Sequence, residues 1–142
     1  MIEPASGIKI RIADKARALG FSAVGFTRAE GLAERVGLER FLAEGREGGM
    51  AWMQDKRDVR GRPEALMPGA RTVIVLGASY APGDESPADP RTAAIALYAR
   101  RRDYHDVLKK RLVVLARWIS ETIGGEARVF VDTAPVMEKP LA

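Results

Sequence analysis

The run Arg-Thr-Val-Ile-Val-Leu at residues 71–76, in which β-branched residues predominate, is the feature that most constrains how this chain folds. Runs of β-branched residues are typical of strands that are covered on both faces. A covered strand needs helices packed against it, so we predict an α/β fold in which a sheet with buried central strands is flanked by helices. Residues 21–26 and residues 127–131 are expected to form further strands of this sheet.

Three amphipathic patterns predict the helices. Apolar residues recur at helical spacing over residues 8–19 and are followed by Gly20, a common helix terminator. A second pattern at residues 32–42 precedes Gly45. The strongest stripe runs over residues 104–119 and leads to a pair of glycines. Helices that alternate with apolar strands support the α/β class.

Two stretches are predicted to be loop-rich. Residues 45–68 contain closely spaced glycines, prolines and charges, with one short helix around Met50, Trp52 and Met53 that is expected to pack on the core. Exposure of these apolar side chains would instead favour a ligand site. Residues 81–90 carry three prolines without an apolar period and are expected to form a polar loop.

Composition limits the remaining possibilities. With 142 residues and 46% hydrophobic content, the chain is predicted to form one domain, residues 1–142. The absence of cysteine excludes disulfides, thiol nucleophiles and thiolate-bound metal within the chain. Without an export signal or an apolar stretch of roughly 20 residues, a cytoplasmic location without membrane insertion is expected.

The sequence pattern near residue 142 suggests that the chain is truncated. A helix is expected to begin at residues 133–135, where Pro135 suits a first turn. Only a few residues remain before Ala142, and a helix so short is not stable alone. We therefore expect the natural protein to continue beyond this sequence.

Positive charge is concentrated in one segment. The chain has a net charge of +4, whereas residues 100–117 hold seven basic residues and only Asp103 and Asp106 as acids, a local charge of +5. Such a segment is typical of a surface that faces phosphates, and equally of a solvated helix face. Beside Asp103, a predicted helix cap, the three arginines Arg100, Arg101 and Arg102 could hold a phosphate.

Asp132 is the candidate for acid–base chemistry. The single histidine and the absence of cysteine leave no metal-binding or Ser-His-Asp pattern, and no glycine-rich phosphate loop is present. Asp132 follows a predicted strand directly, at the strand end where α/β proteins bind ligands. Two interpretations remain open: a partly buried proton donor, or an N-cap for the helix expected next.

Four segments of the chain resemble epoxyqueuosine reductases, in the same order and at similar spacing. The most specific are YARRRDYHDVLKKR at residues 98–111 and VFVDTAPVMEKPLA at residues 129–142. LGFSAVGF at residues 19–26 and RPEALMPGARTVIV at residues 62–75 support them. The resemblance therefore covers nearly the whole chain.

The resemblance implies a cobalamin- and iron–sulfur-dependent oxidoreductase that reduces epoxyqueuosine in tRNA to queuosine at the wobble position of the anticodon. Residues 1–142 would form its amino-terminal cobalamin-binding domain. A later segment, missing here, would carry two 4Fe-4S clusters. An external electron donor would supply these clusters with electrons. This chain alone is therefore expected to be inactive.

The resemblance also assigns roles to individual residues. Asp132 matches the family's proton donor at the cobalt face, and Arg60 matches an arginine that contacts cobalamin. Ala96 stands where some members place a cysteine near the cobalt, so thiolate contact cannot occur there. Two alternative functions remain: a non-catalytic module that binds cobalamin or tRNA, and a corrinoid-dependent reductive dehalogenase.

Overall fold

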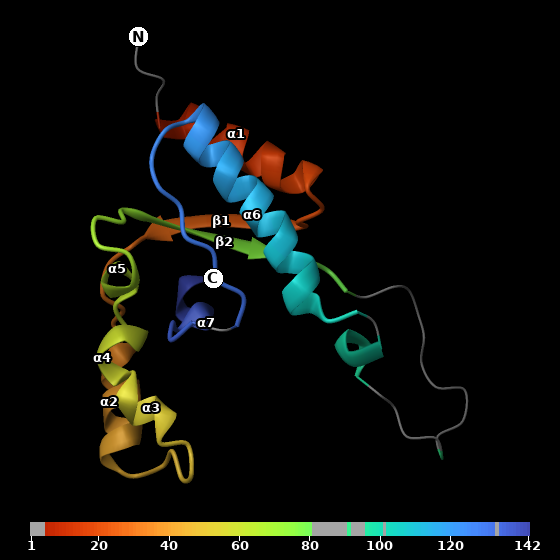
Figure 1. Cartoon of the computed structure of the whole chain (residues 1–142). Coiled ribbons are helices and arrows are strands. Elements are labelled where there is room, and N and C mark those ends of the chain that lie inside the picture. The colour runs from red at the N-terminus through yellow and green to blue at the C-terminus, as the bar shows by residue number, and fades with distance from the viewer. Residues whose placement is uncertain (1–4, 81–90, 92–95, 101, 133) are drawn as a thin grey trace. The chain divides into compact units, whose positions relative to one another are not determined.

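The computed structural model describes residues 5–80, 91, 96–100, 102–132 and 134–142 (Figure 1). The predicted loop at 81–90, together with Arg101 and Thr133, lies outside the described residues. The chain groups into two compact units. The first combines Met1–Ala23 with Leu76–Asp132, and the second combines Val24–Val75 with Thr133–Ala142. Mixed helices and a small sheet give the α/β class expected.

Two long helices belong to the first unit. Helix α1 spans Ala5–Ala18 and α6 spans Tyr104–Thr122, and the two lie side by side (Figure 1). Both were predicted from their apolar spacing, and Gly20 ends α1 with a φ of 88°. The buried residues of this unit are Ile12, Ala13, Ala16, Phe21 and Leu115.

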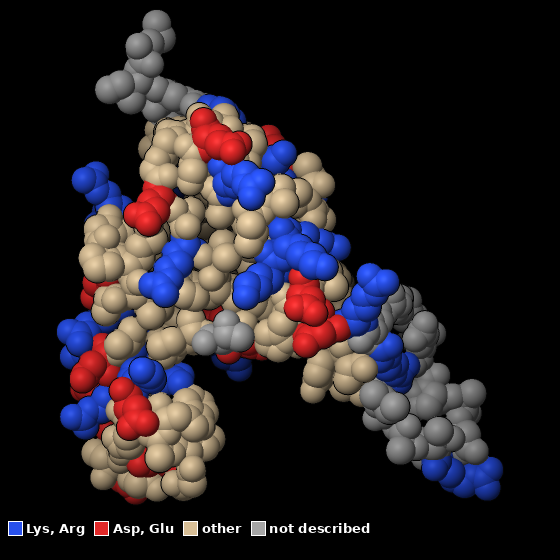
Figure 2. Space-filling view, viewed as in Figure 1, with Lys and Arg blue, Asp and Glu red and all other residues tan. Residues whose placement is uncertain are grey.

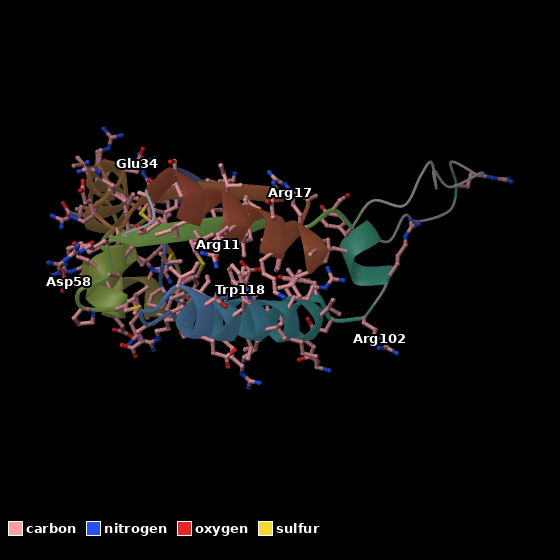
Figure 3. The ribbon with its side chains drawn as sticks, turned by 90° about the horizontal axis from the view of Figure 1, so that it is seen from above. Arg11, Arg17, Glu34, Asp58, Arg102 and Trp118 are labelled. Carbon is pink, nitrogen blue, oxygen red and sulfur yellow. The ribbon has the colours of Figure 1, made fainter. Side chains whose placement is uncertain are left out.

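Basic residues of α1 also lie near an aromatic ring of α6. Arg11 and Lys15 of α1 each lie 5.9 Å from the ring centroid of Trp118 on α6. Figure 3 labels Arg11 and Trp118 on these two helices. Cations over an indole face are attracted by the negative face of the ring, so these contacts add to the apolar packing between the helices.

The sheet consists of two strands, β1 (Ala23–Arg28) and β2 (Thr72–Gly77). Ser22 N–H donates to the Gly77 carbonyl at 2.8 Å and Ala29 N–H to the Arg71 carbonyl at 3.1 Å, so the strands are antiparallel. The prediction of buried central strands is wrong for this part of the chain. Within the part of the chain that the structure describes, each strand has one neighbour, and no residue of either strand is fully buried.

Five short helices belong to the second unit. They are α2 (Arg35–Ala43), α3 (Trp52–Asp55), α4 (Arg57–Arg60), α5 (Pro63–Leu66) and α7 (Glu138–Leu141). The loop-rich segment predicted before β2 thus contains three single-turn helices, α3 to α5. No helix among the residues described here is long and apolar enough to cross a bilayer.

Gly61 allows α2 and the end of α4 to approach closely. A Cβ atom at Gly61 would lie 2.6 Å from Cγ and 2.7 Å from Cβ of Arg35, closer than real contacts permit. The Gly61 carbonyl also accepts a hydrogen bond of 2.8 Å from the Leu32 N–H. The residue directly after Arg60 therefore has to be glycine for this packing.

Two predictions near the carboxyl end are wrong. Residues 127–131 form no strand, because an isolated extended segment has no hydrogen-bonded neighbour in the two-stranded sheet. The expected helix at residues 133–135 is also missing from its described part, and α7 begins only at Glu138. Pro135 lies in a bend, where the Val136 N–H donates to the Ala134 carbonyl at 2.8 Å.

Candidate active site

Asp132 lies exposed at the end of the first unit and is held by a tyrosine. The hydroxyl of Tyr104, the first residue of α6, donates a hydrogen bond to Oδ2 of Asp132. The backbone of Asp132 has a φ of 54°, in the left-handed region that few residues other than glycine adopt. The partial burial expected for this carboxyl is not observed.

Asp132 does not act as the N-cap of a helix that begins beside it. The next helix in the chain is α7, whose N-cap position is Met137 and has no side-chain cap bond. The N-cap interpretation is thus wrong. What remains at Asp132 is an exposed carboxyl with a fixed hydrogen-bond donor.

The N-terminus of α6 fixes the position of Tyr104. Asp103 caps this helix as predicted: its Oδ1 accepts from the His105 N–H at 2.9 Å and lies 2.8 Å from His105 Nδ1. The hydrogen bond from the His105 backbone lowers the pKa of Asp103 most, and the hydrogen bond to the His105 ring lowers it further. The capping aspartate therefore restrains both the helix start and the His105 ring.

The hydroxyl of Tyr104 keeps its proton well above neutral pH. Its hydrogen bond to Asp132, with smaller contributions from desolvation and nearby charge, raises the pKa of Tyr104 to about 12. A neutral phenol has one hydroxyl proton. Tyr104 keeps this proton and uses it to donate the hydrogen bond to Asp132. Tyr104 thus orients the Asp132 carboxyl while remaining uncharged itself.

Aromatic rings form a row from Tyr104 to the surface. The His105 ring stacks on Tyr104 with centroids 4.2 Å apart, and Tyr98 meets Tyr104 edge to face at 6.4 Å. Tyr80 in turn meets Tyr98 edge to face at 6.5 Å. Sequence reasoning assigned Tyr104 to the apolar stripe of α6 and did not single out Tyr80 or Tyr98. A hydroxyl-bearing residue at the first position of that stripe was the available signal.

Arg60 lies in the second unit, at the end of α4. Its guanidinium lies 4.6 Å from the ring centroid of Trp52, and its Nε atom is buried without a hydrogen-bond partner. The short helix expected around Met50, Trp52 and Met53 does not pack on the core through two of these three residues, since Met50 is 41% exposed and Trp52 is 53% exposed. Exposure of these side chains was the condition that favours a ligand site.

The remaining candidate residues lie in the first unit. Ala96 is exposed just before the 3-10 turn Leu97–Arg100, and Arg100 and Arg102 are exposed on either side of Arg101, which is not described. Lys109 and Lys110 are exposed on α6. Figure 2 shows Lys and Arg side chains along this helix. Figure 3 labels Arg102 in the short segment between that turn and α6.

The fold matches those of two solved structures of epoxyqueuosine reductase. It matches the crystal structure of a selenomethionine-labelled epoxyqueuosine reductase with a TM-score of 0.79 and 20% identity over 97% of this chain and 38% of that one. A crystal structure of epoxyqueuosine reductase with an epoxyqueuosine-modified tRNA-Tyr stem loop matches with a TM-score of 0.75, 20% identity and the same coverage. These likenesses define an α/β domain of the epoxyqueuosine reductase type.

Sequence comparison then identifies the family. Residues 60–133 match the family model described as "Epoxyqueuosine reductase QueG, DUF1730", so the chain belongs to the epoxyqueuosine reductase QueG family. Among curated relatives, the epoxyqueuosine reductase of Gloeobacter violaceus is 46% identical over 93% of this chain, and that of Xanthomonas campestris pv. campestris is 41% identical over 93%. The chain spans only 41% and 39% of these two relatives.

Proposed function

We propose that this chain serves in the reduction of epoxyqueuosine in tRNA to queuosine, with Asp132 as the proton donor. The observation that carries the proposal is the exposed Asp132 carboxyl, which the Tyr104 hydroxyl holds in place. It stands at the position that the family resemblance assigns to the proton donor. A carboxyl that is both accessible and oriented meets the geometric requirement for a general acid.

The reaction sets what the site has to supply. Converting an epoxide to an alkene breaks both carbon–oxygen bonds, consumes two electrons and two protons, and releases the oxygen as water. Side chains deliver protons well but do not deliver electrons, so a redox cofactor is required. Asp132 is assigned the proton that goes to the epoxide oxygen as its bond to carbon breaks.

The residues around Arg60 suit cobalamin. Cobalamin carries amide and phosphate oxygens, which can accept from the buried and unpartnered Nε of Arg60. The exposed Trp52 ring beside the guanidinium offers an apolar surface for the same ligand. Bound cobalamin would supply the electron-transfer chemistry that the chain lacks. We assign residues 1–142 to the cobalamin-binding domain, with Arg60 and the segment at Ala96 as contacts.

Electrons have to come from outside these residues. The chain has no cysteine, so it has no thiolate ligand for an iron–sulfur cluster. We assign the two 4Fe-4S clusters to a part of the full-length protein beyond residue 142, with an external reductant as their electron source. The chain spans about 40% of the length of these curated relatives, so the cluster assignment is a proposal about the full-length protein and not about residues 1–142.

The macromolecular partner is tRNA. A solved reductase of the same fold was crystallised with an epoxyqueuosine-modified tRNA stem loop. In this chain, Arg100 and Arg102 are exposed in the segment of net charge +5, which suits contact with the phosphate backbone. We place the reaction in the cytoplasm, without a membrane partner.

The test is Asp132→Asn in the full-length natural protein. Asparagine tolerates the left-handed backbone and still accepts a hydrogen bond from Tyr104, but it cannot donate a proton as an acid. The variant is expected to fold and to bind cobalamin and tRNA, while its single-turnover rate of epoxide reduction falls roughly 10²- to 10⁴-fold.

Asp106→Asn is the matched control, because Asp106 is also an exposed carboxyl of the first unit. The control should keep the wild-type rate. Melting temperature and cobalamin occupancy are measured on the same preparations, so that a folding defect is recognised. Turnover by Asp132→Asn within about threefold of wild type would refute the assignment.

A further inference from the structure

Two tyrosines near the candidate acid are largely open to solvent. Tyr80 is 60% exposed and Tyr98 is 54% exposed, although both carry large rings that usually become buried. They touch each other edge to face, and Tyr98 touches the ring of Tyr104, which bonds Asp132. The three rings therefore form a continuous row that leads from Asp132 to the exposed ring of Tyr80.

Basic residues lie near these tyrosines in the sequence. Arg91, Arg100 and Arg102 lie close to the tyrosines in the sequence, and all three are exposed. Exposed aromatic rings among arginines are typical of surfaces that bind single-stranded nucleic acid, because rings stack on bases while guanidinium groups meet phosphates. An interface with another folded protein would instead be depleted of charge at its centre.

We propose that Tyr98 and Tyr80 form a stacking platform for unpaired bases of the tRNA that flank the base to be reduced. This inference rests on the proposed function, since it takes tRNA as the substrate. A base that reacts at Asp132 has to leave the stack of its neighbours, which removes their stacking partner. Tyr98 and Tyr80 replace that partner, with Tyr104 between Tyr98 and the acid and with Tyr80 beyond Tyr98.

The platform predicts how each substitution affects affinity for the tRNA stem loop. Tyr98→Leu in the full-length protein should weaken binding by about 5- to 150-fold, the usual worth of one aromatic stack on a base. Tyr98→Phe keeps the ring and should bind within about twofold of wild type. Adding Tyr80→Leu to Tyr98→Leu should weaken binding further.

Salt dependence separates stacking from charge. Removing a stacked ring leaves every phosphate contact in place, so the slope of log affinity against log salt should be the same in Tyr98→Leu as in wild type. Ile10→Ala is the control, because Ile10 of α1 is 61% exposed in the same unit and has no part in the row of rings. It should leave affinity and slope unchanged.

The outcomes distinguish this inference from the proposed function. Unchanged tRNA affinity in Tyr98→Leu would overturn the platform, and continued epoxide reduction by that variant would leave the proposed function standing. Loss of cobalamin with intact tRNA affinity would assign the rings to the cofactor and also overturn the platform. A wild-type protein that binds no tRNA would overturn both.

Discussion

The hydroxyl of Tyr104 can be followed directly by titration. The chain has three tyrosines, and the bond to Asp132 raises the pKa of Tyr104 to about 12. Tyrosinate absorbance should therefore show a late step from Tyr104 in the wild-type chain. Asp132→Asn removes the charged acceptor and should move that step down toward about 10. Tyr98→Phe should leave it in place, and a late step that persists in Asp132→Asn would refute the assigned cause.

The same bond has a consequence for stability at high pH. The pKa of Tyr104 is about 12 in the folded chain, above its ordinary value of 10.0. Below pH 10 both states keep the proton, and the contribution of the bond to stability is complete. Between pH 10 and 12 the unfolded chain releases the proton first, so this contribution is lost as the pH rises. Unfolding of wild type and Tyr104→Phe, followed by circular dichroism, should converge across this window.

The sequence singled out Asp132 but not the residue that holds it. Spacing identifies a carboxyl at the end of an apolar segment, and an N-cap at Asp103 follows from its place before a strong helix. The bond from Tyr104 joins residues 28 positions apart, so only the folded chain brings the two together. The ring of Tyr104 fits the helical period of the apolar stripe, so the pattern marks this residue as apolar. The spacing carries no information about its hydroxyl.

At the scale of elements, alanine substitutions at two glycines are expected to change stability in opposite directions. Gly61→Ala would place a Cβ 2.6 Å from the Arg35 side chain and should destabilise the fold by about 1–3 kcal/mol. Gly37 lies within α2, and a Cβ there meets nothing within 4 Å. Gly37→Ala should therefore stabilise by about 0.5–1 kcal/mol. Thermal unfolding of both variants tests the packing, and equal shifts in melting temperature would contradict it.

Elements held by local interactions were the most predictable from the sequence. Helices α1 and α6 have periodic apolar faces, and β1 and β2 lie within two residues of their expected positions. Residues 127–131 carry the same kind of apolar run but form no strand. A strand depends on a hydrogen-bonded neighbour, which one segment of sequence cannot specify. The single-turn helices α3 to α5 are too short to produce a periodic signal.

At the scale of the whole molecule, the basic segment should act through phosphate contacts. Replacing Arg100, Arg101 and Arg102 with alanine in the full-length protein should weaken tRNA binding. It should also reduce the salt slope by roughly 0.7–0.9 for each phosphate that an arginine no longer neutralises, while cobalamin uptake persists. Three exposed arginines elsewhere, Arg28, Arg40 and Arg71, provide a control with the same change in charge. Equal slopes in the two triple variants would mean that the first three arginines are only a solvated surface.

The left-handed backbone at Asp132 also limits which residues can occupy that position. With a φ of 54°, a β-branched or bulky side chain would strain the chain whatever its chemistry. Glutamate keeps the acid but tolerates this conformation less well than aspartate or asparagine. In a library of all substitutions at position 132, glycine, asparagine and aspartate should therefore fold best, and aspartate alone among them can donate a proton. Fold and chemistry thus select the residue independently.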